Sequence, residues 1–150
     1  MQSFKGREKA RRYAMQALYS WQITGNSWQE IEAFYKNDRN PKNYDSDYFS
    51  RLLHDVSANS VAIDEELKLH IDRPFTSLDP IELAILRIST YEFKFCFDVP
   101  YKVVIFEAIE LAKVFGASES YKFINSVLDK MAKHLRAYEI NEVSLGLINE

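Results

Sequence analysis

Side chains that could perform catalysis or bind a metal are few and scattered in this sequence. The three histidines, His54, His70 and His134, have no second histidine or cysteine three or four residues away, so the spacing typical of zinc sites is missing. Glycine-rich phosphate-binding loops and the motifs of serine hydrolases and zinc proteases do not occur either. We therefore expect no bound metal, no cofactor and no enzyme active site.

Two groups of acids and one cysteine are weaker candidates for chemistry. Glu107 and Glu110 are three residues apart, and residues 64–66 are three consecutive acids. Acids spaced in this way usually form the solvated face of a helix. Cys96 follows and precedes phenylalanines, with nothing nearby in sequence to activate it, so we interpret it as a buried, inert thiol.

One tyrosine projects away from the expected core. At about 100° per residue, the apolar stripe of residues 8–24 centres near Ala14 and Trp21, and Tyr19 lies about 150° from it. The polar residues on the same face are Lys9, Arg12 and Gln16. A ring among cations is typical of surfaces that stack unpaired bases and neutralise phosphates. The alternative, an ordinary surface tyrosine, is common.

A phenylalanine near the other end of the chain repeats this pattern. In the segment that starts near Ser118, Phe123 lies about 100° from a stripe centred near Ile124. Its neighbours on the helix surface are Glu119 and Lys130. Packing against a neighbouring helix is the alternative. Together the two rings favour a surface for single-stranded nucleic acid, and RNA fits because proteins usually read splayed RNA bases.

The charge distribution also indicates an anionic partner. Residues 1–13 have a local net charge of +4, whereas the whole chain has a net charge of −3. A basic end on an acidic body favours contact with an anion at that end.

A mixed edge on residues 80–92 indicates a second possible surface. Apolar, hydroxyl and acidic side chains alternate along it, at Ile81, Glu82, Ile85, Ser89 and Glu92. Such an edge could dock a basic protein. Coverage by the following helical segment, or by the linker after Ile71, is the alternative, and the pattern alone favours it.

Six helical segments and one domain are predicted to position these surfaces. Glycines and prolines interrupt the chain, and apolar residues recur at helical spacing between them. Ser27 with Glu30, and Asp79 with Pro80, are typical helix starts, while Gly116 is typical of a helix end. The first three segments are approximately 8–24, 27–38 and 45–71; the fourth begins at residues 78–80, the fifth follows Pro100 and runs to Gly116, and the sixth starts near Ser118. We expect an all-α domain over residues 1–138 and a loose tail over 139–150, with at most a short helical turn.

Composition agrees with one compact domain. The chain has 150 residues, of which 47% are apolar and 27% charged, as in ordinary globular domains. No apolar run is long enough to cross a membrane, and the N-terminus lacks the apolar region of a secretory signal. A single cysteine cannot form an internal disulfide, so we expect a reducing, cytoplasmic setting.

Four strings in this sequence are similar to those of the NusB family of bacterial transcription antitermination factors. They are AMQALYSWQ from Ala14, AILRISTYE from Ala84, DVPYKV from Asp98 leading to EAIELAK, and KFINSVLDK from Lys122. Their order and extent, about residues 7–135, make the resemblance one of the whole domain. It implies an all-helical fold of two packed subdomains and a role without catalysis.

The resemblance also implies partners and contact residues. Family members pair with NusE, a small-subunit ribosomal protein, and bind boxA RNA, forming a complex on RNA polymerase with other Nus factors, notably in ribosomal RNA operons. It assigns RNA contacts to Arg7, Lys9, Arg11 and Arg12, to Tyr19 and Phe123, and to Glu119. Gln16, Lys122, Asn125 and Lys130 would support them. It assigns NusE contact to Glu82 on the edge described above.

This sequence also departs from the family pattern. Phe106 stands where the family usually has Asn, Ser126 where it usually has Gly, and Gly6 and Glu8 interrupt the basic start. Two other functions stay open. The chain resembles modules of ribosomal RNA methyltransferases, although no cofactor-binding domain follows here, and it could be a helical interaction protein without specific RNA binding.

Overall fold

Eight α-helices make up most of the residues that the computed structural model describes, which are 4–144 and 146. No strand occurs among them, which confirms the all-α prediction. The helices are α1 (Phe4–Thr24), α2 (Trp28–Asp38), α3 (Ser46–Ala58), α4 (Ser60–Lys68), α5 (Pro80–Phe95), α6 (Tyr101–Phe115), α7 (Ser120–Leu135) and α8 (Ala137–Ser144). Short 3-10 turns at Pro41–Asn43 and Phe75–Ser77 lie in the two longest connections. Within the described part of the chain, no helix is both long and apolar enough to cross a membrane.

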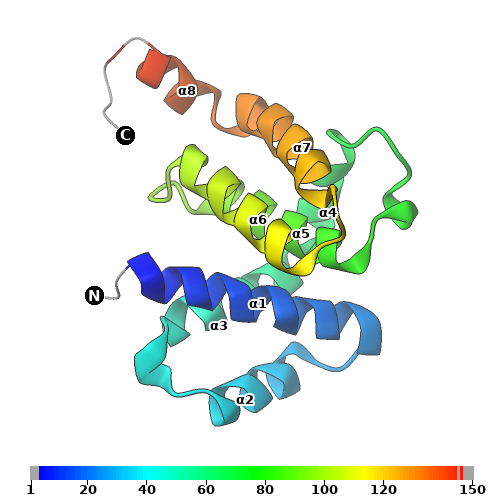
Figure 1. Cartoon of the computed structure of the whole chain (residues 1–150), viewed down its shortest axis with the longest axis vertical. Coiled ribbons are helices and arrows are strands. Elements are labelled where there is room, and N and C mark those ends of the chain that lie inside the picture. Colours follow the sequence, from blue (N-terminus) through cyan, green and yellow to red (C-terminus); the bar gives the residue numbers. More distant parts are fainter. Residues whose placement is uncertain (1–3, 145, 147–150) are drawn as a thin grey trace.

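Helix α5 is the central element of the fold. It packs against α1, α3, α4, α6 and α7, while α1, α2 and α3 pack on one another in the lower part of Figure 1. One continuous apolar core joins both groups, including Leu18 of α1, Phe49 of α3 and Leu86 of α5. Both α1 and α7 therefore pack on the same scaffold helix.

The predicted helix starts are confirmed by their capping bonds. Ser27 Oγ accepts a hydrogen bond from the Glu30 amide at 3.2 Å, and Asp79 Oδ1 accepts from the Ile81 amide at 2.8 Å. Such bonds satisfy amides that have no partner within the helix.

The prediction of six helices was too low by two. The segment 45–71 is broken at Asn59, whose backbone and side-chain nitrogens both donate to the Asp55 carbonyl, at 2.9 and 2.8 Å, and end α3. Asn commonly ends helices in this way, because its side chain competes for backbone partners.

The other additional helix, α8, is formed in part by residues 139–144 of the predicted tail. Buried Arg136 donates to the Phe93 and Val99 carbonyls, each at 2.9 Å. Glu139 accepts from Arg136 at 2.5 Å and from the Tyr101 amide at 2.9 Å. These bonds fix residues 136–139 to the domain, so the boundary expected at residue 138 falls inside an anchored helix. Residues 145 and 147–150 of the predicted tail lie outside the described residues.

Gly116 ends α6 for a different reason than expected. Its backbone is extended rather than left-handed, but a Cβ there would lie 2.8 Å from the Ala112 carbonyl oxygen and 3.0 Å from Ser120 Cβ. The glycine is therefore required by the close approach of the last turn of α6 and of the start of α7.

Candidate nucleic-acid interface

The basic residues at the start of α1 divide between the interior and the surface. Arg11 is 3% exposed, whereas the side chain of Arg12, its neighbour, is 42% exposed. Adjacent helical positions differ by about 100° in direction, which places one arginine inside and one outside. Lys9 is exposed, and Arg7 and Gln16 are half-buried.

Arg11 belongs to an ionic cluster in the interior. Its Nε donates to Glu92 Oε2 at 2.9 Å and its Nη1 donates to Glu107 Oε1 at 3.3 Å. Tyr48 also donates its hydroxyl hydrogen to Glu92. Burial raises the pKa of Glu107, and the Arg11 charge opposes that rise. The guanidinium of Arg11 is thus committed to two carboxylates, and a direct RNA contact through it is not compatible with this structure.

Arg7 is partly committed in the same way. It pairs with Asp98 at 3.2 Å, and its guanidinium carbon lies 4.2 Å from the centre of the Tyr48 ring. Arg12 is less constrained, because its Nη2 lies 3.9 Å from Oε1 of Glu8 and both side chains are exposed to solvent. Of the four predicted basic contacts, Lys9 and Arg12 are the most accessible to a phosphate.

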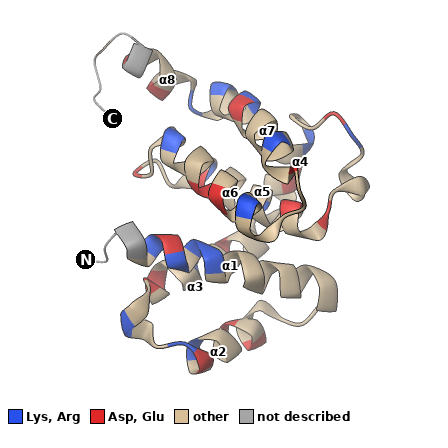
Figure 2. Cartoon of the chain, in the orientation of Figure 1, with Lys and Arg blue, Asp and Glu red and all other residues tan. Residues whose placement is uncertain are grey.

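Tyr19 lies on the surface, as the helical geometry predicted. It is 38% exposed, while Leu18 beside it is completely buried. In Figure 2 the basic residues of α1 occupy its N-terminal half, and the half that contains Tyr19 has none. Arg12 and Tyr19 are seven residues apart, which is about 10 Å along the helix. A strand that reached both would have to extend along α1.

Phe123 is half-buried and has a cation that the sequence did not indicate. The guanidinium carbon of Arg73, from the connection between α4 and α5, lies 3.8 Å from the centre of the Phe123 ring. This is within the range of a cation–π contact. A guanidinium plane can itself stack on a base, and the exposed Arg73 side chain lies over the half-buried Phe123 ring. Nothing in the spacing of residues 73 and 123 could have revealed this contact.

The polar residues predicted around Phe123 are accessible. Glu119 lies directly before α7 with a positive φ of 101°, and its carboxylate pairs with Lys122 Nζ at 2.6 Å. Asn125 and Lys130 are exposed. The two family departures are also on the surface, since Phe106 on α6 is 55% exposed and Ser126 on α7 is exposed.

The two aromatic positions are connected through the first turn of α5. The side-chain Nε2 of Gln22, one turn after Tyr19, donates a hydrogen bond to the Pro80 carbonyl at 2.9 Å. Ser120, one turn before Phe123, donates its hydroxyl to Glu82 Oε2 at 2.8 Å. The end of α1 and the start of α7 therefore converge on α5, which sets the relative position of the two rings.

The mixed edge expected on α5 is not an exposed surface. Glu82, Ile85, Ser89 and Glu92 are 8%, 1%, 3% and 1% exposed, and Ile81 alone among the five is half-buried. Neighbouring helices cover the central helix, and the acids are tolerated because Ser120, Arg11 and Tyr48 satisfy them. The expectation of an exposed docking edge was wrong, and the alternative of coverage by other elements is correct.

A sequence model of the NusB family matches residues 8–133. This chain belongs to the NusB family. The match includes most of α1 and α7 and contains both aromatic positions. The family consists of transcription antitermination factors that are not enzymes, which confirms the expectation that the chain is not an enzyme.

Curated NusB proteins are similar over most of their length. The chain is 49% identical over 134 residues to the transcription antitermination protein NusB of Pseudomonas entomophila, covering 89% of this chain and 81% of the relative. It is 52% identical over 130 residues to that of Pseudoalteromonas translucida, covering 87% and 96%. A solved structure of T. maritima NusB has a TM-score of 0.77 at 28% identity, covering 89% of this chain and 93% of that one.

Proposed function

We propose that this chain is a transcription antitermination factor that binds boxA-containing single-stranded RNA together with NusE. The observation that carries the proposal is the match of 49% and 52% identity to proteins named transcription antitermination protein NusB, over 89% and 87% of the chain. The mechanism is binding. We place it in the cytoplasm, on the RNA polymerase elongation complex with other Nus factors, where it supports transcription of ribosomal RNA operons.

The surface of α1 and α7 supports an RNA-binding role. Tyr19 is 38% exposed on a helix whose other aromatic and apolar residues mostly face the core. Phe123 has Arg73 over its ring at 3.8 Å. Stacking on such groups is worth about 1–3 kcal/mol per base, and Lys9, Arg12 and Lys130 would add salt-dependent attraction to phosphates. Lys122, Asn125 and Gln16 would donate hydrogen bonds.

The contact with NusE is proposed on the family resemblance and on a smaller surface than the sequence indicated. Four of the five predicted residues are buried, so Ile81 in the first turn of α5 is the one with useful accessible area. We expect Ile81→Arg to reduce heterodimer formation on a sizing column. Val61→Arg, at an exposed aliphatic position on α4, is the matched control. Normal heterodimer formation by the Ile81 variant would show that NusE does not bind at Ile81.

Fluorescence anisotropy with boxA and scrambled RNA, with and without NusE, tests the RNA proposal. We expect Tyr19→Ala to weaken boxA binding about 5- to 150-fold, because it removes one stacking contact. Tyr138→Ala is the control, since Tyr138 on α8 is 79% exposed and outside the proposed surface. Unchanged affinity of the Tyr19 variant at fixed salt would exclude stacking, and equal affinity for scrambled RNA would favour a helical interaction protein.

A salt series separates the cations from the rings. Lys9→Ala should reduce the slope of log affinity against log salt by about one, because one phosphate contact is lost. Tyr19→Ala should lower affinity and leave the slope unchanged.

A further inference from the structure

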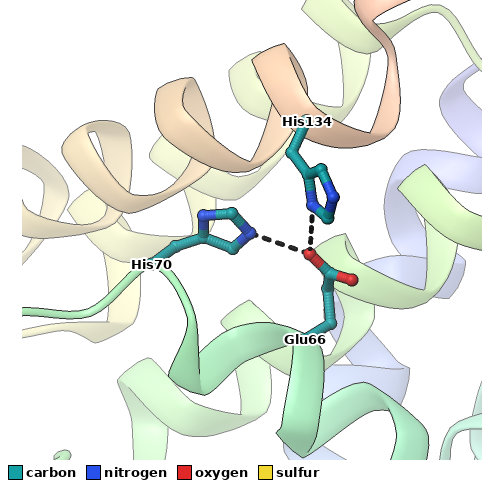
Figure 3. A group of neighbouring side chains, drawn as sticks. All are labelled: Glu66, His70 and His134. Atoms are coloured by element: carbon teal, nitrogen blue, oxygen red, sulfur yellow. Dashed lines mark hydrogen bonds and ion pairs between the residues drawn. The ribbon is translucent and has the colours of Figure 1, made fainter.

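Glu66, His70 and His134 bring three potential metal ligands together from the end of α4, the residues that follow it and the last turn of α7. His70 Nε2 and His134 Nδ1 each lie 2.8 Å from Glu66 Oε2. All three ligand atoms lie within 4.8 Å of one another. Figure 3 shows both imidazoles pointing at the carboxylate, one from the segment after α4 and one from α7. The spacing of histidines and cysteines does not indicate this group, because the local pair is Glu66 with His70 and His134 is distant in sequence.

Rigid elements hold the three side chains. Glu66 lies in the last turns of α4, and His70 follows four residues later, with its amide bonded to the Leu67 carbonyl at 3.1 Å. His134 lies in the last turn of α7. Because α4 and α7 both pack on α5, their separation is fixed by the core. The two rings are tilted by 49° with centres 5.5 Å apart, so they converge on the carboxylate without stacking face to face.

One oxygen of the Glu66 carboxylate, Oε2, faces both imidazoles. Lys94 Nζ lies 3.8 Å from the other oxygen, Oε1. The oxygen that faces the imidazoles, Oε2, is therefore free of the lysine.

We propose that Glu66, His70 and His134 bind one divalent transition-metal ion of the Zn²⁺ type. Two imidazole nitrogens and one carboxylate oxygen suit Zn²⁺ and its first-row neighbours, whereas Ca²⁺ and Mg²⁺ prefer oxygen alone. Three protein ligands leave a fourth position for water, and His134, whose side chain is 55% exposed, gives the site access to solvent.

Small movements would produce the geometry that the ion requires. Tetrahedral ligands at Zn²⁺ bond lengths lie roughly 3.3 Å apart. The nitrogen–oxygen distances of 2.8 Å must open slightly, and the nitrogens must approach each other from a separation of at most 4.8 Å. The bound ion would join α4 to α7 and stabilise the native state.

Titration of the complete chain, without an affinity tag, by calorimetry with Zn²⁺ tests the proposal. We expect one ion per chain and a rise in Tm of roughly 5–10 °C at a hundredfold excess over Kd. Co²⁺ should give the visible absorption of a four-coordinate nitrogen and oxygen site. This readout does not depend on RNA, so it succeeds or fails separately from the proposed function.

Two variants and a matched control locate the ion. His134→Ala, at an exposed position, should weaken Zn²⁺ binding by about tenfold or more and abolish the Co²⁺ spectrum, with an unchanged circular dichroism spectrum. His54→Ala removes an exposed histidine whose partner is Asp55, and should leave binding unchanged. Lys94→Gln should tighten binding, because it removes a competing cation 3.8 Å from Glu66.

Other results would overturn the proposal. These are a stoichiometry far below one, Zn²⁺ affinity unchanged in the His134 variant, or an equal loss in the His54 variant. Any of them would leave the three residues as a hydrogen-bonded connection between α4 and α7.

Discussion

Arg11 and Arg12 are neighbours in sequence and belong to two different regions of the molecule. Arg11 lies in the ionic cluster, with Glu92, Glu107 and Tyr48, and is 3% exposed. Arg12 lies on the surface that extends along α1 toward Tyr19. Both regions consist of arginine, glutamate and aromatic side chains. Burial alone makes one a structural element and leaves the other available to an anionic partner.

The cost of removing a charge should differ sharply between the two regions. In the interior, loss of one partner leaves an unpaired charge where water cannot solvate it, while at the surface water replaces the lost contact. Removing one arginine from each region and comparing the loss of stability therefore tests whether burial separates the two regions.

The largest expected effect is that of Arg11→Ala. It leaves Glu92 and Glu107, which are 1% and 4% exposed, without their cation, and should lower the free energy of unfolding by about 3–5 kcal/mol. Arg12→Ala should change it by no more than about 0.5 kcal/mol. Urea denaturation of both variants measures the difference. Similar losses in the two variants would show that the cluster is not a distinct structural region.

The pH dependence of the same variant sharpens the comparison. Burial raises the pKa of Glu107, and Arg11 opposes this, so removing Arg11 should raise that pKa further in the folded state. A carboxyl with a raised folded pKa binds more protons when folded, so stability falls as pH rises. The deficit of Arg11→Ala relative to wild type should therefore be larger at pH 8 than at pH 5. Denaturation midpoints that differ equally at the two pH values would argue against buried charge as the cause.

A smaller effect is expected at the junction between α5 and α7. Glu82→Ala removes the acceptor of the Ser120 hydroxyl. Because a buried hydrogen bond to a charged group contributes about 1.5–3 kcal/mol, the variant should lower the free energy of unfolding in urea by about that amount. Glu110→Ala, at an exposed position on α6, is the control. If Glu82→Ala denatures like wild type but fails to bind NusE, Glu82 would be a partner contact, not a structural one.

The sequence was sufficient for features that depend on local spacing. The caps at Ser27 and Asp79, the start of α5 at Pro80 and the outward position of Tyr19 follow from neighbours within one or two turns. The break at Asn59 is also local, since its side chain bonds to Asp55 four residues earlier, but the continuous apolar spacing of residues 45–71 concealed it. Helix α8 was missed because it depends on the bonds of Arg136 to distant carbonyls.

The candidate site shows the same division between local and distant contacts. Arg11 and Glu92 looked like surface charges in sequence, since the pairing that allows their burial connects residues 81 positions apart. Arg73 over Phe123, and His134 beside Glu66, are likewise contacts between distant segments. Periodicity indicates the direction of a side chain on its own helix, but does not reveal which other helix covers it.

The smallest expected effect concerns backbone strain at the start of α7, in the proposed binding surface. Among the described residues, Glu119 is the non-glycine residue with positive φ, at 101°, a region where a side chain costs free energy and glycine does not. Glu119→Gly should raise the free energy of unfolding by about 0.5–1 kcal/mol. Glu119→Ala removes the same exposed pair with Lys122 but retains the strain, so it should give no gain. If the two variants had equal free energies of unfolding, the change would come from loss of the ion pair with Lys122 and not from relief of backbone strain. Strain at the start of α7 would then not be a feature that separates this surface from the ionic cluster.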